Sequence, residues 1–454
     1  MRVQKMVPAR GAVLGALVAW AGYAAASPVG VSAQAGPEVC ADRGPALAEE
    51  AWRRLRELAA TPAPAEETVP APRADADTGH ADPRALRSAV EPLVAKFVAL
   101  DHVAQRTLGE DRWRNLPQRR KEDFRQALAR HLAAEAVRSL AAAGPSSHAE
   151  TERLIAPVGP PKRHGDILEI PVSVASPAGE RALWVWFSLR DDEGCRLVDL
   201  RGGGRRIWET LRDRVKSLVN DYSFAYMVAK VGDYDIVTLE DFEANEVGDS
   251  LPFGWDWRDS DRKKPKPYRI REEDGNRYLE ARDEGQSVIL GSKVRWNLDE
   301  YPYVSFRVRV WRIPEGGDER TDDKVDSAAG IYFTLKRKFF GKIPESVKYV
   351  WSSTLPVGTA VRREGIGKPF QVVFGTDKQG LGEWHTYIFD VRQAYRDTFG
   401  GEPPPKTEGI GILSDANSLK SQAYADYDDI RALRSAPPGT GSGVLKVVPP
   451  VKNR

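Results

Sequence analysis

The sequence predicts two folded domains: an α+β domain with helices packed on a small antiparallel sheet, followed by an all-β sandwich of the jelly-roll type. Three observations support this order. Apolar residues follow helical spacing from about residue 84, and strand-like runs with a closing helix follow from residue 167. From Ile236 onward, short strand-like runs alternate with Gly, Pro, Asp and Asn. A chain of 454 residues is long enough for two domains.

The first residues predict export. Three basic residues lie within the first ten positions, and an apolar stretch follows from Gly11 to Ala26. Ala24–Ala26 and Ala33–Ala35 both offer an Ala-x-Ala cleavage pattern, of which we favour the second. We therefore expect a cleaved signal peptide over residues 1–35 and a periplasmic or secreted protein. An uncleaved N-terminal anchor is the open alternative, although the apolar run is short and broken by glycine.

The composition limits which partners and metal sites we expect. A pI of about 8.3 gives little support for a nucleic-acid partner, so we expect none. The two cysteines, Cys40 and Cys195, could pair in an oxidising compartment or stay as separate thiols. Neither belongs to a cluster with zinc-ligand spacing.

The elements of the first domain follow from apolar periodicity. Residues 36–83 should form a short helix, Pro45 to Ala60, and a disordered linker rich in Ala, Pro, Glu and Asp. The domain itself should span residues 84–235. Helical spacing covers 86–97 and 124–137, strands are expected at 167–174, 182–189 and 196–200, and one closing helix should run from Ile207 to about Val228.

The second domain should span residues 236–435, with a disordered tail at 436–454. A single helix is expected, from Val391 to Phe399. Many short strands separated by turn residues are typical of a sandwich or jelly roll. The expected strands cover 278–281, 287–290, 303–311, 330–335, 348–352, 370–374, 384–389 and 409–414.

Part of the first domain resembles a known family. Leu100–Gly109, with Trp113, Pro117 and Phe124 after it, and then Cys195–Leu200 and Gly204–Val215, resemble the MlaC (toluene-tolerance) family of periplasmic phospholipid carriers over residues 84–233. The resemblance implies a cavity for acyl chains. It departs from the family pattern at Leu211, where a tyrosine is usual, and at Arg205–Ile207, where the family is hydrophobic. The candidate pocket residues, which could equally fill a core, are Phe124, Leu128, Leu132, Val172, Trp184, Trp186 and Trp208.

The second domain carries motifs such as Asp241–Glu243, Leu251–Trp255, Tyr349–Ser352, Ile410–Asn417 and Tyr427–Ile430. Through them it resembles a family of exported bacterial β domains of unknown function, related in pattern to galactose-binding-like jelly-roll carbohydrate-binding modules. The likeness to those modules, not the family itself, leads us to expect glycan binding. Loop-borne polar groups and aromatic faces suit that chemistry. The candidates, any of whose tryptophans could instead be core, are Asp322, Asp323, Trp351, Trp384, Asp415 and Asn417.

Acidic residues bracket the second domain. Glu243 follows its first predicted strand, and Asp428 and Asp429 lie in its last. If the two strands are neighbours, these carboxylates could share a structural Ca²⁺, because calcium takes several oxygen ligands. The alternatives are a hydrogen-bonded acidic edge, or carboxylates partnered by Arg431 and Arg434.

The sequence therefore predicts an exported, non-enzymatic binding protein that holds a phospholipid or other apolar ligand and contacts envelope glycan. A transient membrane-surface contact is also expected at the basic, Phe-containing segment Lys336–Lys342. The alternatives are an envelope scaffold without ligand, or a polysaccharide-acting hydrolase or lyase. The last would need two carboxylates at a defined separation, which sequence alone cannot place.

Overall fold

The computed structural model describes residues 83–143, 155–157, 159–160, 162–175, 181–191, 194–202, 205–338, 343–437 and 446–448. Cys40, the predicted signal peptide and the predicted helix at 45–60 lie outside these ranges. The chain divides into two compact units. Pro117–Arg120 and Ser217–Lys230 belong to the second unit, although the residues on either side of them mostly belong to the first.

The first unit combines helices with an antiparallel sheet. Helix α4 shows why its sequence is helical. Its buried residues Leu100, Val103, Ala104, Thr107 and Leu108 recur on one face. Gly109, with φ of 91°, then ends the helix in a conformation that favours glycine. The helices are α3 (Pro83–Phe97), α4 (Leu100–Leu108), α5 (Glu110–Arg114) and α6 (Gln118–Ala143).

The sheet of this unit has the order β1-β3-β4-β5-β6, with β2 also paired to β3. All of its strand pairs are antiparallel, and β3 pairs with β4 along the whole length of β3. The strands are β1 (Ile155–Pro157), β2 (Lys162–His164), β3 (Ile167–Ala175), β4 (Arg181–Asp191), β5 (Gly194–Gly202) and β6 (Arg205–Arg206).

The predicted closing helix is two helices, α7 (Ile207–Asp221) and α8 (Phe224–Gly232). The prediction of one continuous helix was wrong because Ser223 starts a new one. Its hydroxyl accepts a hydrogen bond from the Tyr226 N–H at 3.3 Å, as an N-cap does. The same hydroxyl donates to the Arg295 carbonyl oxygen at 2.8 Å, and the Ser223 N–H donates to that oxygen at 3.0 Å. Ser223 and Arg295 both belong to the second unit, so the break lies within that unit.

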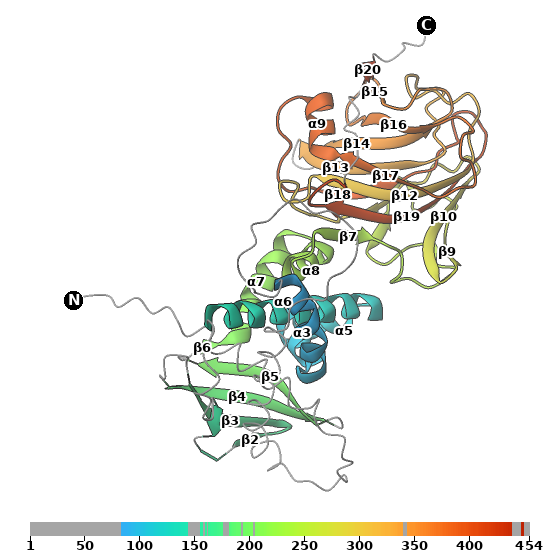
Figure 1. Cartoon of the computed structure of the whole chain (residues 1–454). Helices are drawn as coiled ribbons and strands as arrows, with labels where there is room; N and C mark the ends of the chain where they lie inside the picture. The colour runs from blue at the N-terminus through green and yellow to red at the C-terminus, as the bar shows by residue number, and fades with distance from the viewer. Residues whose placement is uncertain are drawn as a thin grey trace, which may run out of the picture. The chain divides into compact units, whose positions relative to one another are not determined.

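The second unit is two sheets packed face to face around an aromatic core (Figure 1). One sheet has the order β17-β12-β19-β10-β9 with β7 on β19, and the other β20-β15-β16-β14-β13-β18-β11-β8. Phe306 of the first sheet lies 6.4 Å from Phe333 of the second, ring centre to ring centre, and 5.3 Å from Phe374. The predicted order, an α+β domain followed by an all-β sandwich, is confirmed.

One helix, α9 (Val391–Phe399), and a short 3-10 turn, η2 (Asp259–Asp261), accompany these sheets. The strands are β7 (Ile236–Glu240), β8 (Trp255–Trp257), β9 (Tyr268–Glu273), β10 (Asn276–Asp283), β11 (Leu290–Ser292), β12 (Tyr303–Arg312), β13 (Gly330–Lys338), β14 (Ile343–Ser352), β15 (Thr359–Val361), β16 (Phe370–Thr376), β17 (His385–Asp390), β18 (Gly409–Ile412), β19 (Ala423–Leu433) and β20 (Lys446–Val448).

Strand pairing tests two sequence expectations. β7 pairs antiparallel with β19, with Glu240 opposite Ile430, so the first and last long strands are neighbours as expected (Figure 1). By contrast, β20 lies inside the segment predicted to be a disordered tail and pairs with β15. The prediction was therefore wrong for these three residues, whose two valines favour extended backbone.

Candidate functional site

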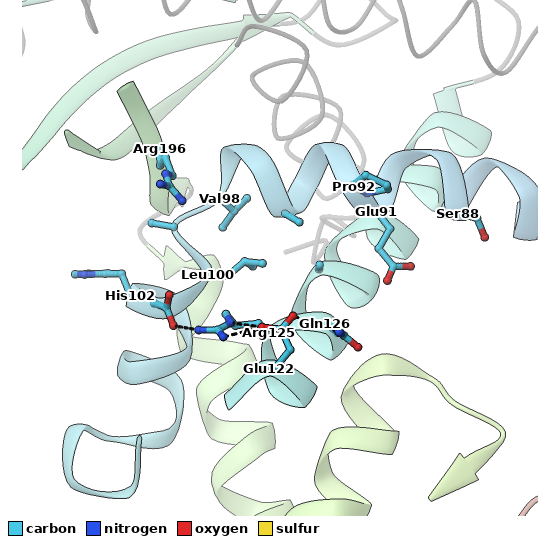
Figure 2. A pocket seen from close by; sticks show the side chains of 14 residues that line it. Ser88, Glu91, Pro92, Val98, Leu100, His102, Glu122, Arg125, Gln126 and Arg196 are labelled. Carbon is cyan, nitrogen blue, oxygen red and sulfur yellow. Dashed lines mark hydrogen bonds and ion pairs between the residues drawn. The ribbon is translucent and has the colours of Figure 1, made fainter. Parts of the chain in front are cut away.

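A cavity of about 800 Å³ lies in the first unit. Figure 2 shows the residues that line it, which come from α3, the link between α3 and α4, α4, α6 and β5. The link between α3 and α4 closes one side, because the Ala99 N–H donates to the Leu197 carbonyl oxygen of β5 at 3.0 Å. The lining residues are Ser88, Glu91, Pro92, Ala95, Val98, Ala99, Leu100, Asp101, His102, Glu122, Arg125, Gln126, Ala129 and Arg196.

The wall of this cavity has an apolar part and a charged part. Val98, Leu100 and Ala129 contribute buried apolar surface. On the other part of the wall Arg125 donates to Asp101 Oδ1 at 2.7 Å and to Glu122 Oε2 at 2.6 Å. A cavity with apolar lining and a few placed charges suits a ligand with an apolar body and a polar end.

His102 adds a neutral polar group. Burial, and to a smaller extent the nearby Arg106, lowers the pKa of His102. Within the described part of the chain its buried Nε2 has no hydrogen-bond partner. At neutral pH His102 therefore offers the cavity an uncharged ring, not a cation.

Four of the seven predicted pocket residues have described side chains. Among the described side chains, Phe124, Leu128 and Leu132 of α6 and Trp208 of α7 are buried, and none of these four lines the cavity. Val172 lies on β3, and Trp184 and Trp186 on β4, but their side chains are outside the described residues. Their roles stay predictions.

Sequence reasoning did not name the cavity's own lining residues. Arg125 and Ala129 lie on a different face of α6 from the apolar stripe that periodicity picks out. One signal was available: Leu100, Asp101 and His102 all belong to the segment that carries the family resemblance. Cys195 lies on β5, and its predicted pairing with Cys40 stays untested.

The second unit carries a group of rings and arginines on the outward face of its six-stranded sheet. On β12, Phe306, Val308 and Val310 point into the core, so the alternating Arg307, Arg309 and Trp311 face outward. The Arg309 guanidinium lies 4.8 Å from the Trp311 ring centre. We call Tyr278, Arg307, Arg309, Trp311 and Trp384 the arginine–aromatic platform.

The platform is held together by its arginines. Arg309 lies 5.3 Å from the Tyr278 ring and 4.6 Å from the Trp384 ring, and Arg307 lies 4.8 Å from Trp384. Arginines over ring faces fix the orientation of the rings. Trp311 is nevertheless 44% exposed, so part of the platform faces solvent.

A buried carboxylate anchors the platform from the neighbouring strand. Arg309 Nε donates to Asp426 Oδ2 at 2.9 Å, and Trp311 Nε1 donates to the same oxygen at 2.7 Å. A second carboxylate, Glu273, accepts from Arg309 at 2.9 Å. Burial raises the pKa of Asp426, while these bonds act in the opposite direction.

The six predicted glycan residues occupy different environments. Trp384 belongs to the platform, whereas Trp351 is in the core, where its Nε1 donates to the Asp377 carbonyl oxygen. Asp322, next to the exposed Asp323, accepts from Arg363 and Lys368. Asn417 is exposed, but Asp415 is buried.

Asp415 is an unusual member of this set. Its Oδ1 is buried and lacks a hydrogen-bond partner among the described residues. Burial, with a contribution from Asp326, raises its pKa, and Lys348 acts in the opposite direction. A raised pKa in a carboxyl group is also what a general acid needs, so Asp415 is the residue on which to test the enzyme alternative.

The acidic residues of the predicted calcium site, Glu243, Asp428 and Asp429, have protein hydrogen-bond partners. Glu243 Oε1 accepts from the Arg277 N–H at 2.8 Å. Asp428 accepts from Asn276 and Arg307, and Asp429 accepts from Arg431 at 2.6 Å. Within the described ranges, no group of three or more His, Cys, Asp or Glu could hold a metal ion. The calcium site stays a prediction, and these contacts match the alternative of a hydrogen-bonded, arginine-neutralised edge.

Two further features bear on membranes. Lys336–Lys338 are exposed at the end of β13, and the rest of the predicted contact segment, 339–342, lies outside the described residues. That contact stays a prediction. Across the ranges that the structure covers, no helix is both long and apolar enough to cross a membrane.

Comparison with known proteins agrees with both resemblances. Residues 65–232 match the model of a family described as MlaC protein, and residues 254–431 match that of a family described as a protein of unknown function, DUF3047. No curated protein matches the chain. A similar solved structure is a phospholipid-binding protein from Ralstonia solanacearum in complex with a phospholipid. The two are 14% identical over 30% of this chain and 73% of that one, with a TM-score of 0.23.

Proposed function

We propose that this chain is an exported binding protein of the bacterial envelope, whose MlaC-like first domain holds a phospholipid or another ligand with an apolar tail. The proposed site is the cavity between α3, α4, α6 and β5. The proposal places the mature protein in the periplasm after removal of its signal peptide, and gives it no catalytic step.

The observation that carries the proposal is the cavity itself, in the segment that matches the MlaC family. Its volume of about 800 Å³ is within the range of small-molecule pockets. Buried apolar residues such as Val98 and Leu100 would take the ligand's tail, and Arg125 would lie near its polar end. Each methylene of a tail that leaves water contributes about 0.8 kcal/mol.

A pair of variants on α3 tests the site. Ala95 lines the cavity, while Ala89 is exposed on the same helix and is not among the lining residues. Ala95→Trp should obstruct the cavity, and displacing about four methylenes of a ligand would cost about 3 kcal/mol, or about two hundredfold in affinity. Ala89→Trp should leave binding unchanged.

The assay is titration of each variant with a fluorescent phospholipid, with circular dichroism as the control for folding. Equal affinity of the two variants would remove this cavity from the proposal. If neither variant nor the unmodified protein binds phospholipid, the scaffold alternative, a folded protein without ligand, is favoured instead.

A second candidate function, glycan binding by the second unit, is favoured by the arginine–aromatic platform. Aromatic faces pack on sugar rings, and fixed guanidinium groups donate to hydroxyls or carboxylates. Trp311 and Trp384 together supply a partly exposed aromatic surface, with Arg307 and Arg309 between the rings. We therefore assign the envelope-glycan role to this face of the sheet.

Its test is affinity electrophoresis in gels containing polysaccharide. Trp311→Ala combined with Trp384→Ala should abolish any retardation. Tyr303→Ala is the matched control, because Tyr303 is a partly exposed aromatic at the other end of β12. Retardation that survives the double change would exclude the platform as the glycan site.

A further inference from the structure

The loop between β7 and β8 exposes apolar side chains. Within residues 245–254, Val247 is 54% exposed, Leu251 39% and Phe253 46%. These are three of the seven large apolar residues exposed to such a degree in the described part of the chain. We call residues 245–254 the docking loop.

The loop is held in this conformation by its backbone. Asn245, itself buried, donates from Nδ2 to the Phe242 carbonyl oxygen at 2.9 Å and accepts from the Phe253 N–H at 2.5 Å. The Gly248 N–H donates to Ile270 of β9 at 2.9 Å, and the Ile270 N–H donates to Asp249 at 2.8 Å. These hydrogen bonds hold the loop in one closed conformation with its apolar side chains exposed to solvent. Binding would therefore not require the loop to become ordered.

A basic segment continues from this loop. Residues 258–271, which we call the basic flank, contain seven Lys or Arg and two Asp. Ile270 joins the flank to the docking loop, so the exposed Arg269 and Arg271 on either side of it lie next to the loop backbone.

Part of this positive charge is not neutralised. The buried Asp261 pairs with Arg258 and Lys264. Lys263 and Arg269, however, have no carboxylate within ion-pair distance among the described residues.

The loop also has two acids of its own. One of them, Asp249, accepts the Glu246 N–H at 3.1 Å, and both side chains are exposed. Two acids outside the loop and flank also take part: Asp256 pairs with Arg262 at 2.7 Å and Glu280 with Arg271 at 3.1 Å. The positive charge next to the loop is therefore mainly that of Lys263 and Arg269.

From these observations we infer that the docking loop and basic flank form a peripheral membrane-binding site that takes a bilayer surface rich in anionic phospholipid. Apolar side chains beside uncompensated basic residues match the two layers of such a surface, acyl chains beneath negative headgroups. Three exposed side chains are too few for a stable protein interface, which buries about 1,200 Å² or more. They are enough for shallow insertion assisted by charge. This site is independent of the cavity and of the lipid-binding proposal.

Sedimentation of the full chain with vesicles tests the inference. The vesicles are phosphatidylcholine alone, or phosphatidylcholine with about one-third phosphatidylglycerol. Leu251→Asp combined with Phe253→Asp should weaken binding to the anionic vesicles at least tenfold. The matched control is Val357→Asp combined with Ile366→Asp, which changes two apolar residues, 60% and 85% exposed, in the same unit and adds the same charge. The control should bind as the unmodified protein does.

A third variant tests the charge. Lys263→Gln with Arg269→Gln should weaken binding to anionic vesicles severalfold and reduce its dependence on salt. The inference is overturned if the two double-Asp variants bind equally, or if the unmodified protein binds both kinds of vesicle alike. It is also overturned if the loop variant binds vesicles normally but loses a protein partner. If the loop variant fails to bind vesicles but still retains phospholipid in its cavity, the membrane site and the proposed lipid-binding function are tested separately.

Discussion

Replacing Arg309 by methionine should show how far the arginine–aromatic platform depends on one buried ion pair. Methionine is about as long as the apolar stem of arginine, so the change keeps the stem and removes the guanidinium. It takes away the bonds to Asp426 and Glu273 and the cation beneath the platform rings. Asp426 is 0% exposed, so its carboxylate would stay buried with one of its two arginine partners, Arg282 at 3.4 Å, and Trp311.

The size of the effect follows from that burial. Removing one partner of a buried ion pair costs about 3–5 kcal/mol, because the other charge stays out of water. Trp311 still donates to Asp426 and Arg282 still pairs with it, so we expect the bottom of that range, about 3 kcal/mol at pH 7.5. Burial already raises the pKa of Asp426, and losing Arg309 should raise it further. The protonated form then favours folding, so the loss should shrink as the pH falls and grow as it rises.

Hydrogen exchange across a urea series, read by mass spectrometry on peptides from β12 and β19, measures the stability of the second unit by itself. Arg309→Met should lose at least about 1 kcal/mol more at pH 7.5 than at pH 5. Adding Asp426→Asn to Arg309→Met should recover about 2 kcal/mol, since the buried charge is gone. A loss below about 1 kcal/mol, or one that does not change with pH, would refute this reasoning.

Three further predictions concern the cavity, pH and catalysis. Arg125→Gln should lower the share of anionic phospholipid bound to the protein about fivefold, because each lost positive charge costs about 1 kcal/mol of binding free energy. Arg112→Gln, outside the cavity, should not change that share. Lipid analysis of the purified variants checks both expectations. Burial raises the pKa of Asp428 to about 6, above its unfolded value, so its protonated form favours folding and that stability is lost as the pH rises. Between pH 5 and 7 the unmodified protein should therefore lose about 1 kcal/mol more than Asp428→Asn in urea unfolding. Asp415→Ala should leave envelope polysaccharide as intact as the unmodified protein leaves it, and depolymerisation lost in this variant would revive the enzyme alternative.

Local sequence signals predicted much of the fold. The helix Val391–Phe399 was predicted with its observed bounds, because Asp390 caps its first turn by accepting the Gln393 N–H at 2.8 Å and Gly400 follows its end. The long strand β12 was also predicted from a local pattern, because apolar and polar residues alternate along it. By contrast, β9 was missed: only Tyr268 and Ile270 face the core, and the rest of the strand reads as a charged loop.

The candidate sites depend on contacts that no local pattern encodes. Arg309 and Asp426 are 117 residues apart in the chain and meet only because β12 pairs with β19. The cavity likewise depends on which face of α6 is turned toward α3, and apolar periodicity marks the packed face, not the cavity face. Sequence could therefore predict the two domains and one platform residue, Trp384, but none of the residues that line the cavity.

The most direct test of the central claim is mass spectrometry of an organic extract from the protein purified without detergent. The proposed function predicts phospholipid in near-stoichiometric amount, retained in Ala89→Trp and strongly reduced in Ala95→Trp. An extract free of lipid from a folded protein would contradict it and would leave the second unit as the place to search for a ligand.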